Sequence, residues 1–190
     1  MSLLDLVDNN RTDKNTVHSY LPLYEQLLFS KKETAKDVLE VGIAQGGGSI
    51  KLWNDYFQHA TIYGLDIIPK SMVPSDLYSL PRVKLYTSTN AYDRTFVETT
   101  FSNTRFDMVL DDGPHSLESM IMFIKLFSPL LKEDGILIIE DVQRWEWIDI
   151  LKEVVSDELK HYVQCYDLRG NKGRYDDIVF TINKSLKLNN

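Results

Sequence analysis

The sequence predicts an α/β fold, an open and mostly parallel sheet with helices on both faces. Short apolar runs alternate with helix-length segments along most of the 190 residues. The runs are apolar throughout, which is typical of parallel strands covered on both sides. Strands separated by helix-length segments imply right-handed crossovers between parallel neighbours. The chain is therefore expected to form a doubly wound sheet.

The N-terminal half predicts a helix and then the first strand–helix–strand unit. Apolar residues recur at helical spacing over residues 17–28, and we expect this helix to pack on the edge of the core. Residues 38–41 form a β-branched run that ends at Gly42. A glycine-rich turn and a helical pattern up to Phe57 follow, and residues 61–65 predict the next strand.

The second half continues this alternation and then changes character. The expected elements are a strand at 83–86, a strand at 106–110, a helix at 119–131 that Asp134 and Gly135 end, and a strand at 136–139. Two further runs, residues 162–168 and 178–182, flank a polar turn at 169–174. This pattern predicts a C-terminal antiparallel hairpin at the sheet edge.

Composition excludes several classes of protein. The formal net charge is -7, which disfavours diffuse attraction to nucleic acids and to anionic membranes. Cys165 is the only cysteine, so an intrachain disulfide and a cysteine-built zinc site are excluded. The chain has no basic leader and no run near the roughly 20 apolar residues of a membrane span. We expect a cytoplasmic protein.

A ligand site is expected beyond the carboxyl ends of the strands, as in other Rossmann-like sheets. Gly42 and Gly46 would let backbone approach a ligand, and Asp66 ends the next strand, where its carboxylate can accept ribose hydroxyl protons. This arrangement suits an adenosine-containing cofactor. A nicotinamide dehydrogenase is the competing interpretation, but its Gly-x-Gly-x-x-Gly fingerprint is broken at Ala44.

Acidic residues gather at the next two strand ends. Asp111 and Asp112 follow one strand with His115 close behind, and Glu140 and Asp141 follow the neighbouring strand. Crowded carboxylates must protonate or bind a cation, and oxygen ligands suit Mg²⁺, Mn²⁺ or Ca²⁺. A cation and a histidine base together would activate a hydroxyl group. Two plainer alternatives are a helix-capping role for His115 and a solvated strand end at the Glu140-Asp141 pair.

The glycine loop resembles motif I of class I S-adenosylmethionine-dependent methyltransferases. Its residues 40–46 read Glu-Val-Gly-Ile-Ala-Gln-Gly and are followed by Asp66. The resemblance implies that Glu40 and the backbone from Gly42 to Gly46 face the methionine part of the cofactor. It implies that Asp66 binds the ribose.

A longer set of motifs resembles the macrocin and mycinamicin sugar O-methyltransferases over residues 12 to about 182. The matching segments are Thr12-Asp13-Lys14 with His18 and Tyr24, residues 53–57, Asp111-Asp112-Gly113-Pro114-His115 and Glu140-Asp141-Val142. The family usually has serine at position 114 and an acid at Asn90.

The resemblance implies roles for several of these residues. Asp112, Glu140 and Asp141 would bind the metal, with Asp112 and His115 catalytic and His115 the general base. Cofactor neighbours would be Asp111, Asn90 and Ala91, with Asp13 and Lys14 closing the cleft.

These expectations define one leading function and two alternatives. The leading one is a single class I methyltransferase domain over residues 1–190, whose helical segment 1–30 covers the cleft. It would use S-adenosylmethionine and a divalent cation to methylate a hydroxyl of a sugar, a glycan or a small hydroxylated acceptor. A homo-oligomer is left open. The alternatives are a metal-independent small-molecule methyltransferase and a non-catalytic, methyltransferase-like binding module.

Three further groups receive plain interpretations from the sequence. Trp145 and Trp147 could wall a sugar site, but aromatic residues at a helix start are more often packing residues. His59, His161 and the Asp176-Asp177 pair are interpreted as surface or hairpin groups.

Overall fold

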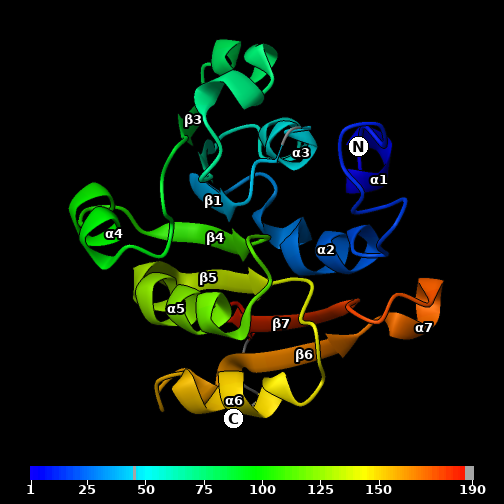
Figure 1. The fold of residues 1–190 in the computed structure, drawn as a ribbon, viewed down its shortest axis with the longest axis vertical. Coiled ribbons are helices and arrows are strands. Elements are labelled where there is room, and N and C mark those ends of the chain that lie inside the picture. The colour runs from blue at the N-terminus through cyan, green and yellow to red at the C-terminus, as the bar shows by residue number, and fades with distance from the viewer. Residues whose placement is uncertain (45, 187–190) are drawn as a thin grey trace.

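A computed structural model describes residues 1–44 and 46–186, and its centre is a seven-stranded sheet (Figure 1). The strand order is β3-β2-β1-β4-β5-β7-β6. The strands are β1 (Asp37–Val41), β2 (Thr61–Leu65), β3 (Val83–Tyr86), β4 (Phe106–Asp111), β5 (Leu131–Ile139), β6 (Val163–Asp167) and β7 (Ile178–Asn183).

Helices cover both faces of this sheet. The α-helices are α1 (Leu3–Leu6), α2 (Leu21–Leu28), α3 (Gly48–Tyr56), α4 (Arg94–Thr100), α5 (Leu117–Phe127), α6 (Trp147–Val154) and α7 (Arg169–Lys172). Short 3-10 turns are η1 (Phe29–Lys31), η2 (Lys70–Met72), η3 (Ser75–Ser79), η4 (Ser128–Leu130) and η5 (Lys160–Tyr162).

The topology confirms the predicted doubly wound sheet. β1 pairs in parallel with β2 on one side and with β4 on the other, so the strand order reverses beside β1. Val41, the last residue of β1, is in register with Leu65 on β2 and with Asp111 on β4. The carboxyl ends therefore meet at one edge, where this class of sheet binds its ligands.

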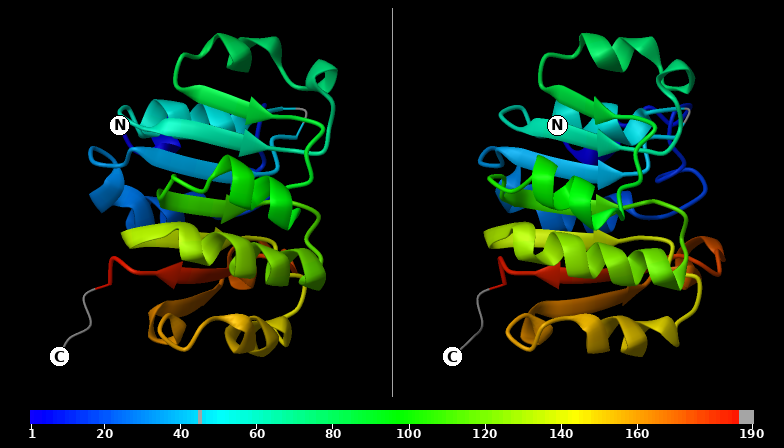
Figure 2. Two further views of the ribbon diagram at one scale, coloured as in Figure 1. Left: turned by 90° about the vertical axis from the view of Figure 1, so that its left-hand side faces the viewer. Right: turned by 60° about the vertical axis from the view of Figure 1, so that its left-hand side comes forward.

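Two apolar layers sandwich the sheet. One contains Val97 of α4, Phe123 of α5 and Ile148 of α6, and the other contains Leu21 of α2 and Trp53 of α3. Figures 1 and 2 show α4, α5 and α6 on one face, with α1, α2 and α3 on the other. Successive strand residues point to opposite faces, so the central strands contribute to both layers.

The N-terminal helix is shorter and more central than predicted. It begins at Leu21 because Pro22 is suited to the first helical turn, and Val17 lies outside it with 42% of its surface exposed. Leu21, Tyr24 and Leu28 of α2 are fully buried. The helix therefore covers a face of the sheet, and the expected position on the core edge was wrong.

The boundary between α5 and β5 also differs from the prediction. Ser116 caps α5, which begins at Leu117 and ends at Phe127. Pro129 follows in a 3-10 turn, and β5 starts at Leu131. The predicted helix end at Asp134 and Gly135 was wrong because both residues lie within the strand.

The antiparallel C-terminal hairpin is confirmed. β7 pairs antiparallel with both β5 and β6, so β6 is the edge strand. The polar turn contains the short helix α7. Among the described residues, no helix has both the length and the apolar character needed to cross a bilayer.

Candidate functional site

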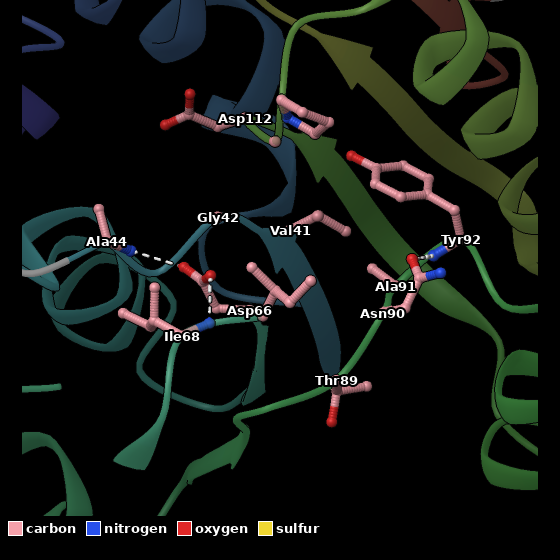
Figure 3. Close-up of a pocket in the computed structure, with 13 residues that line it drawn as sticks. Val41, Gly42, Ala44, Asp66, Ile68, Thr89, Asn90, Ala91, Tyr92 and Asp112 are labelled. Atoms are coloured by element: carbon pink, nitrogen blue, oxygen red, sulfur yellow. Dashed lines mark hydrogen bonds between the residues drawn. The ribbon is translucent and has the colours of Figure 1, made fainter. Parts of the chain in front are cut away.

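A cavity of about 520 Å³ opens at the carboxyl ends of β1, β2 and β4 (Figure 3). Its lining combines the two loops that follow β1 and β2 with the segments before α4 and α5. The lining residues are Val41, Gly42, Ala44, Asp66, Ile67, Ile68, Thr89, Asn90, Ala91, Tyr92, Asp112, Gly113 and Pro114.

Asp66 is held in place by backbone amides. Its Oδ2 accepts hydrogen bonds from the amides of Ile43 at 2.8 Å and Ala44 at 2.9 Å, and its Oδ1 accepts from Ile68 at 3.0 Å. Figure 3 shows the bonds from Ala44 and Ile68. Each carboxylate oxygen can accept more than one bond, so Asp66 can also receive ligand hydroxyls. Ile67 and Ile68 provide an apolar wall that was missed, although two apolar residues directly after Asp66 were a usable signal.

Asn90 and Ala91, the predicted cofactor neighbours, line the same cavity. The Oδ1 of Asn90 accepts a hydrogen bond from the amide of Tyr92 at 3.0 Å, which fixes the turn. Tyr92 donates its hydroxyl to Oδ1 of Asp111 at 2.6 Å. Asp111 does not line the cavity itself; burial raises its pKa to about 7, and it positions the Tyr92 ring.

Gly42 and Gly46 are each required as glycine by a close approach within the chain itself. Gly42 has φ +99°, and a Cβ there would lie 2.0 Å from the carbonyl oxygen of Asp112. A Cβ on Gly46 would lie 2.2 Å from the carbonyl oxygen of Arg11. Both positions need glycine because another part of this chain passes close by. Gly42 lines the cavity, whereas Gly46 is not among its lining residues.

Lys14 and Glu40 are buried beneath the site. Lys14 is 1% exposed. Its Nζ lies 2.8 Å from Asp112 Oδ2 and 3.4 Å from Glu40 Oε1. The same ammonium group donates a hydrogen bond to Glu140. Glu40 accepts from Trp53 Nε1 at 2.8 Å. Neither Lys14 nor Glu40 lines a described cavity, and their predicted roles at the cofactor stay predictions. Lys14 compensates buried carboxylates, which would be costly to leave unpaired.

The charges around Lys14 shift several pKa values. Burial alone would lower the pKa of Lys14, but Asp112, Glu140 and Glu40 raise it well above its usual value, so it stays charged. Burial opposes ionisation of Asp112, yet Lys14 brings its pKa down to about 2. Burial raises the pKa of Glu40 to about 7 and also raises that of Glu140.

Asp112, His115 and Asp141 form a compact group that we name the His115 cluster. One ligand atom from each lies within 4.8 Å of the others. His115 Nε2 is 3.3 Å from Asp112 Oδ1, and its Nδ1 is 3.2 Å from Asp141 Oδ2. Burial lowers the pKa of His115, but the hydrogen bond to Asp112 and the charge of Asp141 outweigh it, so the net pKa is raised.

Backbone geometry also distinguishes this cluster. His115 has φ 56° and Asp141 has φ 55°, both in the left-handed region that non-glycine residues rarely adopt. Such strain is often found at functional sites. The helix-capping interpretation of His115 was wrong, since Ser116 caps α5 and the imidazole lies between two carboxylates.

Glu140 points to a different set of partners. Its Oε1 accepts from Lys14 and its Oε2 accepts from the hydroxyl of Tyr24. It is 2% exposed and is not part of the His115 cluster. The solvated-strand-end interpretation was wrong, and its predicted role as a metal ligand stays a prediction.

The N-terminal segment contributes Tyr20, which the sequence did not single out, and His18, which matched the family motif without an assigned role. Tyr20 donates its hydroxyl to Oδ1 of Asp141. His18 Nδ1 lies 2.6 Å from Oδ1 of Asp177, which is fully buried beside the 6%-exposed Asp176. The surface interpretation of the Asp176-Asp177 pair was therefore wrong. The spacing of Tyr20 and Tyr24, four residues apart, could have indicated one helical face turned toward two acids.

A second cavity of about 360 Å³ adjoins the first. Both are lined by Gly42, Ala44 and Asp112, and the second adds residues 9–13, including Asp13. Asp13 therefore lies at the predicted cleft.

The two tryptophans after β5 differ in burial. Trp147 packs against the core as expected. Trp145 is 41% exposed, and the Arg169 guanidinium lies over its ring.

Solved structures with similar folds include several methyltransferases. The MycE methyltransferase in complex with Mg, SAH and mycinamycin VI has a TM-score of 0.74 at 22% identity, and the match covers 96% of this chain and 54% of that one. A putative caffeoyl-CoA O-methyltransferase from Staphylococcus aureus has a TM-score of 0.60 at 18% identity, covering 96% of this chain and 92% of that one. The chain has the class I methyltransferase fold.

Curated relatives confirm the resemblance to sugar O-methyltransferases. The 8-demethyl-8-alpha-L-rhamnosyl tetracenomycin-C 2'-O-methyltransferase of Streptomyces olivaceus is 28% identical over 76% of this chain and 39% of its own length. The mycinamicin VI 2''-O-methyltransferase of Micromonospora griseorubida is 30% identical over 69% of this chain and 33% of its own length. The chain thus spans between a third and two fifths of these relatives. No family model matches it.

Proposed function

We propose that this chain is an S-adenosylmethionine-dependent O-methyltransferase. The cofactor would occupy the larger cavity, with its ribose on Asp66, its adenine between Ile67 and Ala91, and its sulfonium toward Asp112. The anchored carboxylate of Asp66 and the apolar walls beside it support this placement. The class I fold and the methyltransferase relatives support the reaction type.

The acceptor would be a hydroxyl of a sugar, a glycan or a small hydroxylated molecule. One observation carries this proposal: Asp112 lines the cofactor cavity and also belongs to the His115 cluster. A reactive hydroxyl bound there would lie beside both the methyl donor and a base. The named activities of the relatives on sugar-bearing antibiotics favour the same acceptor class.

His115 would act as the general base. Asp141 holds the ring through Nδ1, which leaves Nε2 on the side of Asp112 and the cavity. As the acceptor oxygen attacks the methyl carbon, the carbon–sulfur bond breaks, the carbon–oxygen bond forms and the hydroxyl proton passes to Nε2. Much of the rate would come from holding the two reactants in line.

The residues present fit a divalent cation. Asp112 and Asp141 bring carboxylate oxygens to within 4.8 Å of each other, and hard cations prefer such oxygens. These two would hold Mg²⁺, Mn²⁺ or Ca²⁺, with Glu140 as the predicted third ligand. When bound, the cation would stabilise the negative charge that develops on the acceptor oxygen.

Metal-independent methyl transfer is a second candidate, and Lys14 favours it. The ammonium group of Lys14 already pairs with both Asp112 and Glu140, so the site contains a cation of its own. In that case His115 would be sufficient as the base. Activity that survives a strong chelator and an Asp141→Ala change would select this mechanism.

Isothermal titration with S-adenosylmethionine, with and without Mg²⁺, tests the proposal. We expect binding in both cases and tighter binding or faster turnover with Mg²⁺. Methyl transfer to a panel of glycosides should fall about 100-fold or more in His115→Gln, because general bases contribute at least that much. His161→Gln, at an imidazole away from the cluster, should leave transfer unchanged. Failure to bind the cofactor would remove the proposal.

A further inference from the structure

A second group of side chains of metal-ligating types shares Asp141 with the His115 cluster. His18, Asp141, Asp176 and Asp177 each bring one ligand atom to within 4.8 Å of the others, and all four residues are buried. We name them the His18 cluster. They come from the N-terminal segment, from the loop after β5 and from the residues just before β7.

The contacts within this cluster centre on the His18 imidazole. Its Nδ1 lies 2.6 Å from Asp177 Oδ1 and 3.4 Å from Asp141 Oδ1. Its Nε2 is 3.8 Å from Asp13 Oδ2. Three buried carboxylates therefore surround one imidazole, and Arg174 pairs with one of them, Asp176, at 3.2 Å.

Asp176 has an oxygen that the protein leaves without a partner. Its Oδ2 receives a hydrogen bond from Arg174 at 3.2 Å, whereas its Oδ1 is buried and makes no hydrogen bond. The residue is 6% exposed. A buried, unpartnered carboxylate oxygen is costly unless something binds it, and metal coordination is one of the few ways to satisfy it.

Asp141 connects the two clusters. Its Oδ1 faces His18 and the Tyr20 hydroxyl, and its Oδ2 faces His115. The two oxygens of one carboxylate therefore serve different clusters. This is the arrangement of a carboxylate that bridges two neighbouring cation sites.

The geometry points to a second divalent-cation site, formed by His18, Asp141, Asp176 and Asp177. An imidazole nitrogen with carboxylates suits Mn²⁺, Fe²⁺ or Zn²⁺, while the oxygen ligands proposed for the first site suit Mg²⁺. The site goes beyond the proposed methyl transfer and does not rest on it, because cation binding is measurable without turnover. The competing explanation is a purely structural His18–Asp177 ion pair that ties the N-terminal segment to β7.

Binding of Mn²⁺ in the presence of excess Mg²⁺ separates the two explanations. Mg²⁺ should saturate the first site, and electron paramagnetic resonance then counts the Mn²⁺ that stays bound. We expect one Mn²⁺ per chain under these conditions. Complete displacement of Mn²⁺ by Mg²⁺ would overturn the second site and leave the first intact.

Asp176→Asn is the most informative variant. It keeps the side-chain shape and an oxygen for Arg174, so the protein should still fold, but it removes a charged ligand. We expect Mn²⁺ affinity to fall at least about 10-fold. Asp149→Asn, at an acid whose side chain is 91% exposed, is the matched control and should bind as the unmodified protein does. Unchanged affinity in Asp176→Asn would overturn the proposal.

Asp112→Asn completes the experiment. It removes a proposed ligand of the first site and none of the second. We expect it to lose Mg²⁺ binding, measured by calorimetry, and to keep the Mn²⁺ that Mg²⁺ does not displace. Loss of both cations together would show one shared site and would contradict two separate ones.

Discussion

The two sides of the carboxyl edge are built differently. On the side of β1 and β2, Asp66 is held by backbone amides from a loop only 23 residues away at Ile43. On the side of β4, β5 and β7, buried side chains hold one another over much longer separations, such as the 126 residues between Lys14 and Glu140. The first side is a preformed cavity, and the second is a charged network completed by the N-terminal segment.

This difference indicates where substitutions should matter most. The partners of Asp66 are neutral backbone amides, so replacing its carboxylate leaves no unpaired charge in the protein interior. A buried charge network stays stable only while every member is present, since removing one partner leaves the others uncompensated. The network side should therefore show stability effects and the cavity side binding effects.

Lys14→Met should have the largest effect. It leaves Glu40, Asp112 and Glu140 without their cation, and we expect a loss of about 3–5 kcal/mol in the free energy of unfolding. Chemical denaturation measures it. Lys31→Met is the control, because Lys31 pairs with a mostly exposed Asp134 and should cost at most about 1 kcal/mol. Equal losses of unfolding free energy in the two variants would show that the buried charge network contributes no more to stability than a single ion pair.

Gly42→Ala should have the second-largest effect. It tests the close contact between the loop after β1 and the loop after β4, where the two sides meet. The new Cβ would lie 2.0 Å from the Asp112 carbonyl oxygen at φ +99°, so we expect about 2–3 kcal/mol of destabilisation. Gly170→Ala, where a Cβ meets nothing within 4 Å, should change stability by less than about 0.5 kcal/mol. Thermal unfolding of both variants gives the comparison, and a tolerated Gly42→Ala would show that the two loops can separate.

Asp66→Asn should weaken cofactor binding more than it weakens the fold. An amide cannot accept from all three backbone amides with both of its polar atoms, so its orientation toward ligand hydroxyls is lost. We expect the Kd for S-adenosylmethionine to rise about 10-fold, equivalent to about 1.4 kcal/mol. Asp157→Asn, at an exposed acid, should bind normally. A large stability loss in Asp66→Asn would erase the distinction between the two sides.

Removing the hydroxyls of Tyr20 and Tyr24 should have the smallest effect and tests whether the buried side chains act as one coupled network. Tyr20→Phe and Tyr24→Phe each remove one hydroxyl, from Asp141 and Glu140 respectively. In a coupled network the double variant should differ from the sum of the single ones by about 0.5–1 kcal/mol in unfolding free energy. Strict additivity would show that the two tyrosines act independently.

Local patterns were sufficient for most of the parallel sheet and for Asp66. Apolar runs and the residues that end them are properties of short segments, so β1, β2 and β4 follow from them. The boundary between α5 and β5 did not follow. Pro129 ends the helix, but the apolar pattern continues across it into the strand, and periodicity alone does not separate the two.

The sequence by itself determined the fold class, the cofactor-side loop with Asp66, and the presence of acids and His115 at neighbouring strand ends. Only the tertiary structure decided their partners: that Lys14 is buried among three carboxylates, that Asp141 lies between two imidazoles, and that Asp177 pairs with His18. The physical reason is the sequence separation over which each kind of interaction acts. Strand and turn preferences act between near neighbours, whereas a buried charge takes whichever counter-charge the folded chain brings within a few ångströms.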